Sequence, residues 1–282
     1  MESASNMIIN VIHGIMDSKL ADYLSLTNIL YFIIFILFAF FTKQRIKPLY
    51  DIAKLANIKG LYSGKSLNNE IESNIKKSDV IKIKVTRGHG LFVNKESVFY
   101  KNMFKNTNVS KKKFTILLLN PCLQSPIIKS RAASNGISTQ NYVESVVEVI
   151  LKCYEANSNP DNPNQINVRF YKDQDIGWRY YLFEDKHNMV VFFCNSHSDI
   201  SGPKMPMIKV THKKNNLCDH FNQSFDRICN DSLTQLVIDG NEKNDNSQQD
   251  QLASLLVCDH NECKDLIMKT YIELNKRKNF NV

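Results

Sequence analysis

A histidine between two glycines is the first candidate for chemistry in the sequence. Arg87, Gly88, His89 and Gly90 follow a segment of alternating apolar and polar residues. Glycine lets a backbone come close to a ligand, and ligands of open α/β sheets bind beyond the carboxyl ends of the strands. These four residues, together with Asn120 after the next apolar segment, are therefore the candidate site for a phosphate-containing or nucleotide ligand. The alternative is that His89 is only a turn residue.

Metal-binding residue types occur in two places, at Cys218-x-His220 and at Cys258-x-His260-x-x-Cys263. Structural zinc sites usually use two ligand pairs at regular spacing, and Cys258 and His260 are too close in sequence to share one helical face. The sequence also contains no Walker loop, no dinucleotide fingerprint and no Gly-x-Ser-x-Gly. We therefore predict no metal and no cofactor.

The segments that must position the candidate residues alternate between strand and helix. VIKIKVT (80–86) has the two-residue period of a half-buried strand, and FTILLL (114–119) is typical of a strand covered on both faces. An amphipathic helix is expected over 143–154 and a third strand at INVRFY (166–171). Further expected elements are helices at 46–58, 66–77, 95–105, 220–232 and 251–276, strands at 178–183, 189–194 and 207–210, and a loop at 122–139. This order predicts an α/β domain with a mixed sheet, parallel at first and antiparallel at its edge.

Several of these pieces together resemble the phospholipase D-like superfamily, in its single-module bacterial form. They are IKIKVTRGHGLF, KKKFTILLLNP, INVRFY, RYYLFEDKHNMVVFFCNS and FNQSFDRICNDS, within residues 80–231. In active members a His-x-Lys-x4-Asp motif provides a histidine that attacks phosphorus and a lysine that holds the phosphoryl oxygens. The resemblance makes Asp185 the aspartate, which leaves Trp178 and Tyr180 at the histidine and lysine positions. Since neither side chain can replace them, the domain is expected to be catalytically degenerate.

A second segment matches the same motif letter for letter, with His212, Lys214 and Asp219. It lies after the last expected core strand, and Asp226 occupies the position where the family has a glycine. We favour a surface loop for this segment. The alternative is a membrane-anchored phosphodiesterase or nuclease that uses these three residues.

A membrane span is predicted at Tyr23–Thr42, which contains no charged side chain and is entirely apolar or aromatic from 29 to 41. At a rise of about 1.5 Å per residue, such a helix matches the thickness of a bilayer. The span is followed by a cluster of basic residues, namely Lys43, Arg45, Lys47, Lys54, Lys59 and Lys65. The positive-inside rule then places the amino terminus outside and the remaining chain in the cytoplasm. No small-residue cleavage site follows the apolar run, so an uncleaved anchor is expected.

Composition agrees with this arrangement. The formal net charge of +8 is partly due to the basic cluster after the span, which would face anionic lipid headgroups. A second basic cluster at 101–113 is typical of a solvated face, so nucleic acid is the less favoured partner. The seven cysteines are scattered and odd in number, which fits reduced thiols in a cytoplasmic domain.

The chain is thus divided into an amphipathic extracytoplasmic segment (1–22), a transmembrane helix (23–42), a basic juxtamembrane linker (43–79), the α/β domain (80–232), a polar linker (233–250) and a helical tail (251–282). We expect a single-pass protein of the bacterial inner membrane with a non-catalytic, ligand-sensing domain. By analogy, it would be an effector in signalling or anti-phage defence. A scaffold that recruits a protein partner through 251–276 is a third alternative, and homo-oligomerisation is left open.

Overall fold

The computed structural model describes residues 57–105, 111–122, 125–185, 188–195, 205–212, 217–231 and 235–240, together with Asn10, Ile34, Phe35, Lys54 and Ile272. The chain divides into two compact units, Met1–Leu55 and Ala56–Val282, and the second contains the sheet and its helices. Among the described residues, no helix is both long and apolar enough to cross a membrane. The predicted span at 23–42 lies outside these residues except for Ile34 and Phe35, which are helical.

One mixed sheet of eight strands forms the centre of the second unit, in the order β1-β7-β6-β5-β2-β3-β4-β8. The strands are β1 (Ile58–Tyr62), β2 (Val80–Val85), β3 (Lys113–Leu119), β4 (Gln165–Tyr171), β5 (Trp178–Glu184), β6 (Met189–Asn195), β7 (Met207–Thr211) and β8 (Gln235–Ile238). β2, β3 and β4 are parallel neighbours, and all other pairings are antiparallel. The predicted α/β class, with a sheet that is parallel first and antiparallel at its edge, is confirmed.

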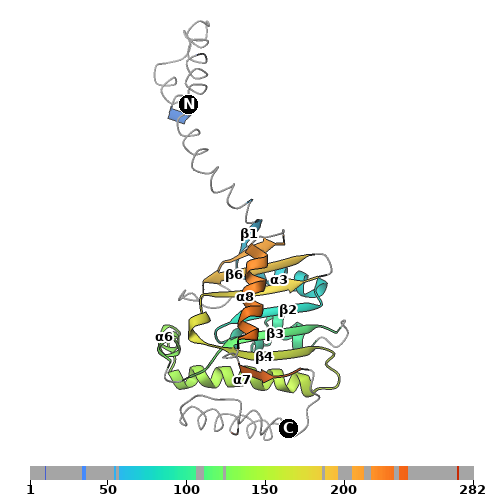
Figure 1. Cartoon of the computed structure of the whole chain (residues 1–282), viewed down its shortest axis with the longest axis vertical. Helices are drawn as coiled ribbons and strands as arrows, with labels where there is room; N and C mark the ends of the chain where they lie inside the picture. Colours follow the sequence, from blue (N-terminus) through green and yellow to red (C-terminus); the bar gives the residue numbers. More distant parts are fainter. Residues whose placement is uncertain are drawn as a thin grey trace. The chain divides into compact units, whose positions relative to one another are not determined.

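Helices cover both faces of this sheet (Figure 1). They are α3 (Gly64–Lys77), α4 (His89–Phe92), α5 (Val98–Tyr100) with a π-helical turn η1 (Lys101–Lys105), α6 (Pro126–Ser134), α7 (Thr139–Ser158), the 3-10 turn η2 (Asp173–Asp175) and α8 (Leu217–Asn230). Neighbouring residues of β5 show the two faces: Tyr180 packs on Phe221 of α8, with ring centroids 4.9 Å apart, and Tyr181 packs on Phe99 of α5, at 5.0 Å. The chain therefore forms three layers, with α8 alone on one face among the described helices.

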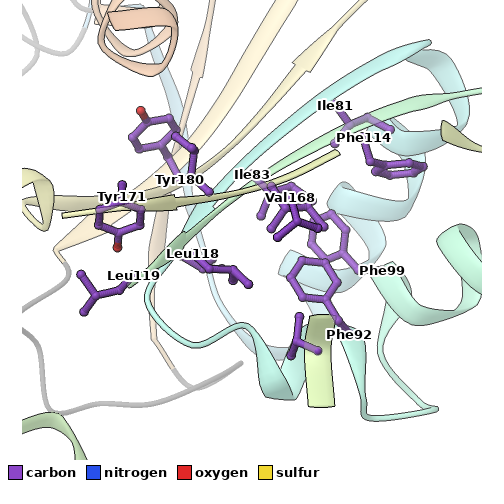
Figure 2. Close-up of a cluster of buried hydrophobic side chains, with 14 of the residues drawn as sticks. Ile81, Ile83, Phe92, Phe99, Phe114, Leu118, Leu119, Val168, Tyr171 and Tyr180 are labelled. Carbon is purple, nitrogen blue, oxygen red and sulfur yellow. The ribbon is translucent and has the colours of Figure 1, made fainter. Parts of the chain in front are cut away.

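The core lies mainly on the face opposite α8. Ile81, Ile83, Phe114 and Ile116 of the parallel strands have no exposed surface. Phe92 and Phe99 lie side by side beneath these strands, with ring centroids 6.2 Å apart (Figure 2). Because α4 and α5 are short, their aromatic side chains provide most of the contact that holds the segment after β2 against the sheet.

Three expectations about local structure were wrong. The expected loop at 122–139 contains α6, whose first turn is capped by Ser125 Oγ accepting a hydrogen bond from the Ile128 N–H at 3.2 Å, with proline at the first helical position. These are standard helix-start signals. Ile58 belongs to a strand and does not end a helix, and the preceding Asn57 has a φ of 53°, which ends helical geometry. The helix expected from Ser66 begins at Gly64 with Ser63 as its cap residue.

The α/β unit is also larger than the expected 80–232. β1 pairs with β7, and α3 buries Leu67, Ile71 and Ile75, so residues before 80 belong to the same core. β8 pairs with β4 in the segment expected to begin a polar linker. The sequence separates these edge strands from their partners by about 150 and about 70 residues, and short strands so far from their partners have little local signal.

A buried lysine links the centre of the sheet to the β4–β5 connection. Lys84 is 2% exposed, and its ammonium group donates hydrogen bonds to the backbone carbonyls of Asp175, Ile176 and Trp178, the last at 2.9 Å. It also lies 4.6 Å from the ring centre of Tyr171, which permits a cation–π contact. Burial lowers its pKa to about 8, against a smaller opposing effect of Asp175. The charge is held by carbonyl dipoles and an aromatic face, without a direct carboxylate contact.

Lys84→Met should change the pH dependence of stability. Between about pH 8 and the usual lysine pKa of 10.5, the unfolded chain binds more protons at this site than the folded protein does. The contribution of Lys84 to the free energy of unfolding therefore rises with pH in this window, by up to about 1.4 kcal/mol per pH unit. Urea unfolding of the full chain and of Lys84→Met is measured from about pH 7 to about pH 9.5. The free energy of unfolding of the full chain, relative to that of the variant, should rise with pH. A difference that stays constant with pH would contradict the assignment.

Candidate functional site

Four of the five predicted binding residues lie together in one cavity of about 470 Å³. Arg87, Gly88, His89 and Gly90 line it where β2 ends, and the other walls come from α3, α6, α7 and β5–β7. Asn120 follows β3 but is not part of the lining, and its backbone N–H donates to the carbonyl of the last residue of β4 at 2.9 Å. The cavity thus lies beyond the carboxyl end of β2, beside β5, β6 and β7.

Two arginines that the sequence analysis missed, Arg131 of α6 and Arg179 of β5, line the same cavity. Arg87 lies over the ring of Tyr142, with 5.5 Å between its guanidinium carbon and the ring centre. Burial raises the pKa of Tyr142, while the positive charges of the three arginines oppose this rise. Three arginines from separate parts of the chain thus line one cavity together with Tyr142.

The positive charge of this cavity is poorly balanced. Within the described part of the chain, neither Arg87 nor Arg179 forms a salt bridge. Glu96 also lines the cavity, but it pairs with Lys101 at 2.8 Å and its side chain is 83% exposed. Half-buried cations without a counter-charge are unfavourable, so the cavity is suited to an anion.

Arg179 also has unused hydrogen-bonding capacity. Its Nη2 donates to the Asn195 carbonyl at 3.4 Å and contacts the sulfur of Met205, while its buried Nε has no hydrogen-bond partner among the described residues. A guanidinium group has five N–H donors in a planar fork that matches carboxylate and phosphate oxygens. Among the described residues, part of the Arg179 guanidinium group is therefore available to bind a ligand.

His89 stands at the rim of the cavity as half of a His–Glu pair. Its Nε2 lies 3.0 Å from a carboxylate oxygen of Glu148 on α7, and both side chains are 36% exposed. The contact orients the imidazole ring. His89 is therefore a positioned side chain, and the interpretation of this residue as only part of a turn is incomplete.

Gly88 is required for a reason other than ligand approach. Its φ of 75° is in the left-handed region, and a Cβ atom there would lie 2.9 Å from the ring of Phe92 and 3.1 Å from Leu118. A Cβ atom added to Gly90, in contrast, would meet no described atom within 4 Å. Gly88 allows the chain to turn tightly from β2 into α4, which brings Arg87 and His89 to the cavity.

The His-x-Lys-x4-Asp match lies at the other end of the sheet. β7 runs from Met207, which lines the cavity, to Thr211, and His212 follows. His212 Nδ1 is 3.1 Å from a carboxylate oxygen of Asp219 at the start of α8, and Lys214 lies outside the described residues. The strand length separates this pair from the arginine cavity, so the two candidate sites cannot act on one ligand group.

The positions that the phospholipase D-like resemblance assigns to the catalytic histidine and lysine hold aromatic packing. Trp178 lies 5.7 Å from Phe193 and 6.4 Å from Phe221, and Tyr180 lies 6.2 Å from Phe225, measured between ring centres. These side chains hold α8 on the sheet. Trp178, at the histidine position, has no group that could attack phosphorus, and Tyr180, at the lysine position, carries no positive charge for phosphoryl oxygens.

A second cavity, of about 260 Å³, lies on the α8 face. Three cations line it, namely Lys82, Lys113 and Arg169. Lys82 is balanced by Glu184 at 2.8 Å and Asp226 at 3.0 Å and donates to Asn222 at 2.6 Å. Burial is the largest influence on the Lys82 pKa and lowers it, yet the two carboxylates and their hydrogen bonds together raise it. Within the described residues, two carboxylates, Asp226 and Asp239, line this cavity beside its cations, whereas the only acidic residue that lines the first cavity is Glu96. The first cavity is therefore the better candidate for an anion.

Metal-binding clusters of three or more His, Cys, Asp or Glu residues do not occur in the described parts of the chain. Cys218 is buried in α8, which also contains His220. Cys258, His260 and Cys263 lie outside the described residues. The proposed partner segment 251–276 is likewise outside them except for Ile272.

Comparison with known proteins gives little further information. No family model matches the sequence, and no curated protein matches it. Among solved structures, TrmBL2, an archaeal chromatin protein described as having a novel mode of DNA binding, aligns with 10% sequence identity and a TM-score of 0.30. The alignment covers 71% of this chain and 66% of that chain, which is slightly less than two thirds of its length. A likeness at this level is too low to indicate a shared fold.

Gly88→Ala should destabilise the protein more than Gly136→Ala. Both glycines have positive φ, 75° and 66°, but only Gly88 has atoms within 4 Å of the added Cβ. Backbone strain costs about 1–2 kcal/mol in each variant, and crowding adds about 1–3 kcal/mol at Gly88 alone. Urea unfolding of the two variants measures the difference directly. Equal losses would mean that the contact with Phe92 and Leu118 does not constrain the turn.

Proposed function

We propose that this protein is a single-pass membrane protein whose α/β domain binds a phosphate-containing ligand in the three-arginine cavity and acts as a sensor. The observation that carries the proposal is the convergence of Arg87, Arg131 and Arg179 on one cavity beyond the carboxyl end of β2. Arginine forms paired hydrogen bonds with phosphate oxygens, and such bonds are strong where water is partly excluded.

The membrane part of the proposal rests on the sequence. Tyr23–Thr42 is long enough and apolar enough to span a bilayer, and the basic residues that follow it favour a cytoplasmic carboxyl-terminal side. A sensor attached to such an anchor can report ligand binding by changing the association of its spans, because attachment to one membrane raises effective concentration. By analogy alone, this arrangement suits an effector of bacterial signalling or anti-phage defence.

A degenerate phospholipase D-like domain remains our proposal for the ancestry of the sheet. It is supported by the sequence pieces that resemble this superfamily and by the aromatic side chains of Trp178 and Tyr180 at the two positions where the active family needs histidine and lysine. A domain of this kind would have kept an anion site and lost hydrolysis.

An enzyme is the second candidate, favoured by one specific observation. His212 and Asp219 lie 3.1 Å apart, as a histidine nucleophile and its orienting carboxylate would. However, α8 starts at Leu217, and Lys82, a cation near its sheet-facing side, is already paired with two carboxylates. The sensor therefore remains the preferred function.

Arg87→Gln and Arg179→Gln should each weaken binding of pyrophosphate to the purified full chain in nonionic detergent. Loss of one charge-assisted hydrogen bond of about 1.5–3 kcal/mol corresponds to about a tenfold or larger rise in Kd. Isothermal titration calorimetry provides the measurement. Arg227→Gln is the matched control, because it makes the same charge change on α8, where Arg227 pairs with Asp175 on the surface. Equal weakening in the control would indicate general electrostatics and count against the cavity.

His212→Ala should leave cellular function and ligand binding intact, because the sensor forms no phosphohistidine. The reason is geometric: His212 lies at the opposite end of β7 from the cavity. Function is measured by complementation with the variant, after checking its unfolding midpoint. Loss of function with a preserved fold, or a trapped phosphoenzyme in the parent protein, would favour the phosphodiesterase instead.

A reporter fused to the carboxyl terminus should show a cytoplasmic location. A fluorescent protein that folds only in the cytoplasm is expected to be active there, and a phosphatase that needs an oxidising compartment is expected to be inactive. The matched control moves the basic residues Lys43, Arg45 and Lys47 to the amino-terminal side of the span. Activity of the phosphatase in the unaltered chain would contradict the orientation.

A further inference from the structure

The three-arginine cavity is not uniform along its length. In the antiparallel ladder Arg179 pairs with Cys194, and Phe193 pairs with Ile208, so Met207 is level with Cys194 on the next strand. All three of Arg179, Cys194 and Met207 line the cavity. The cavity therefore runs across the strands, from the arginines near β2 toward the methionines near β7.

The β7 end of the cavity is apolar. It is lined by Met205 and Met207 together with Leu67 and Ile71 of α3, and all four side chains are at most 7% exposed. α3 is held over this end by a salt bridge between Glu70 and Lys209 of β7, at 2.9 Å. Among the described residues, no lysine, aspartate or glutamate side chain lines this end of the cavity, and the Arg179 guanidinium reaches its edge at Met205.

The opposite end contains Arg87, Arg131 and Tyr142, with Arg179 between the two ends. Tyr181 and Phe99, whose ring centres are 5.0 Å apart, also line the middle of the cavity. Aromatic rings provide flat faces, which suit a planar group. One end of the cavity thus suits a negatively charged group of a ligand, and the rest suits an uncharged, partly planar group.

Polar uncharged side chains also line the cavity. Asn68 of α3 and Ser97 before α5 line the cavity, and neither side chain forms a hydrogen bond in the described part of the chain. An amide has both donors and an acceptor and can read the edge of a heterocyclic base. The volume of about 470 Å³ is within the range of about 300–1,000 Å³ that encloses whole organic ligands. Inorganic phosphate alone would leave most of the cavity unused.

We propose that the ligand is a nucleotide, with its phosphate at Arg87, Arg131 and Arg179 and its base between Tyr181, Phe99 and the apolar β7 end. This inference rests on the proposed function, since it requires an anion at the arginines. An alkyl phosphate has the same charged end and an apolar body, but it would make no use of Asn68, Ser97 or the aromatic faces.

The test compares ligands that share a phosphate and differ in their body. Isothermal titration calorimetry on the full chain in nonionic detergent would use pyrophosphate, ribose phosphate, purine and pyrimidine nucleoside monophosphates, and a short-chain alkyl phosphate. We expect at least one nucleoside monophosphate to bind about tenfold or more tightly than ribose phosphate. Binding of all phosphates with equal affinity, or tightest binding of the alkyl phosphate, would overturn the nucleotide while leaving the arginine site intact. If no phosphate compound binds, the proposed function fails as well.

A substitution at the apolar end distinguishes the contribution of the base to binding from that of the phosphate. Met207→Gln should weaken nucleotide binding about fivefold or more and change pyrophosphate binding by less than about twofold. Met207→Leu, which keeps an apolar side chain, should retain nucleotide affinity. Equal effects of Met207→Gln on both ligands, with an unchanged unfolding midpoint, would overturn the placement of the base. The ligand series on the unaltered protein stays decisive if Met207→Gln does not fold.

Discussion

A single buried ammonium group, that of Lys84, holds the point where the sheet changes from parallel to antiparallel pairing. It binds the carbonyls of Asp175, Ile176 and Trp178, which make up the connection between β4 and β5. This contact determines where β5 begins beside β2. Because Arg179 is the second residue of β5, the same contact brings its guanidinium group to the end of β2, where the cavity lies. The candidate site therefore depends on a structural lysine on the other face of the sheet.

The cations on the two faces of the sheet have different partners. On the α8 face, Lys82 is paired with Glu184 and Asp226, and Lys84 and Arg169 donate hydrogen bonds to backbone carbonyls. On the other face, Arg87 and Arg179 have no carboxylate partner in the described residues. A fold loses stability by gathering half-buried charges without partners, and a bound anion would restore it. This asymmetry supports ligand binding more strongly than the total charge of the chain, which does not distinguish the faces.

The sequence predicted those strands and helices whose hydrophobic periodicity is visible within a single segment. The alternation in VIKIKV, the apolar run in FTILLL and the stripe of valines in the helix after Ser138 correspond to β2, β3 and α7. The missed elements have other causes. α6 has no amphipathic stripe, and its signal is only Ser125 and Pro126 at its start. β1 and β8 are edge strands, and what holds them is pairing with partners far away in the sequence.

For the site, the sequence by itself determined Arg87, Gly88, His89 and Gly90, because residues that follow a parallel strand must lie at the ligand-binding edge of its sheet. It also shows that, at the positions which the resemblance assigns, Trp178 cannot replace a histidine nucleophile and Tyr180 cannot replace a lysine cation. Only the tertiary structure decided that Arg131 and Arg179 line one cavity with Arg87 and Tyr142. Their positions depend on the crossing of α6 over the strand ends and on the antiparallel register of β5 with β2. Neither feature has a local sequence signal, since both arise from contacts between segments that are far apart in the chain.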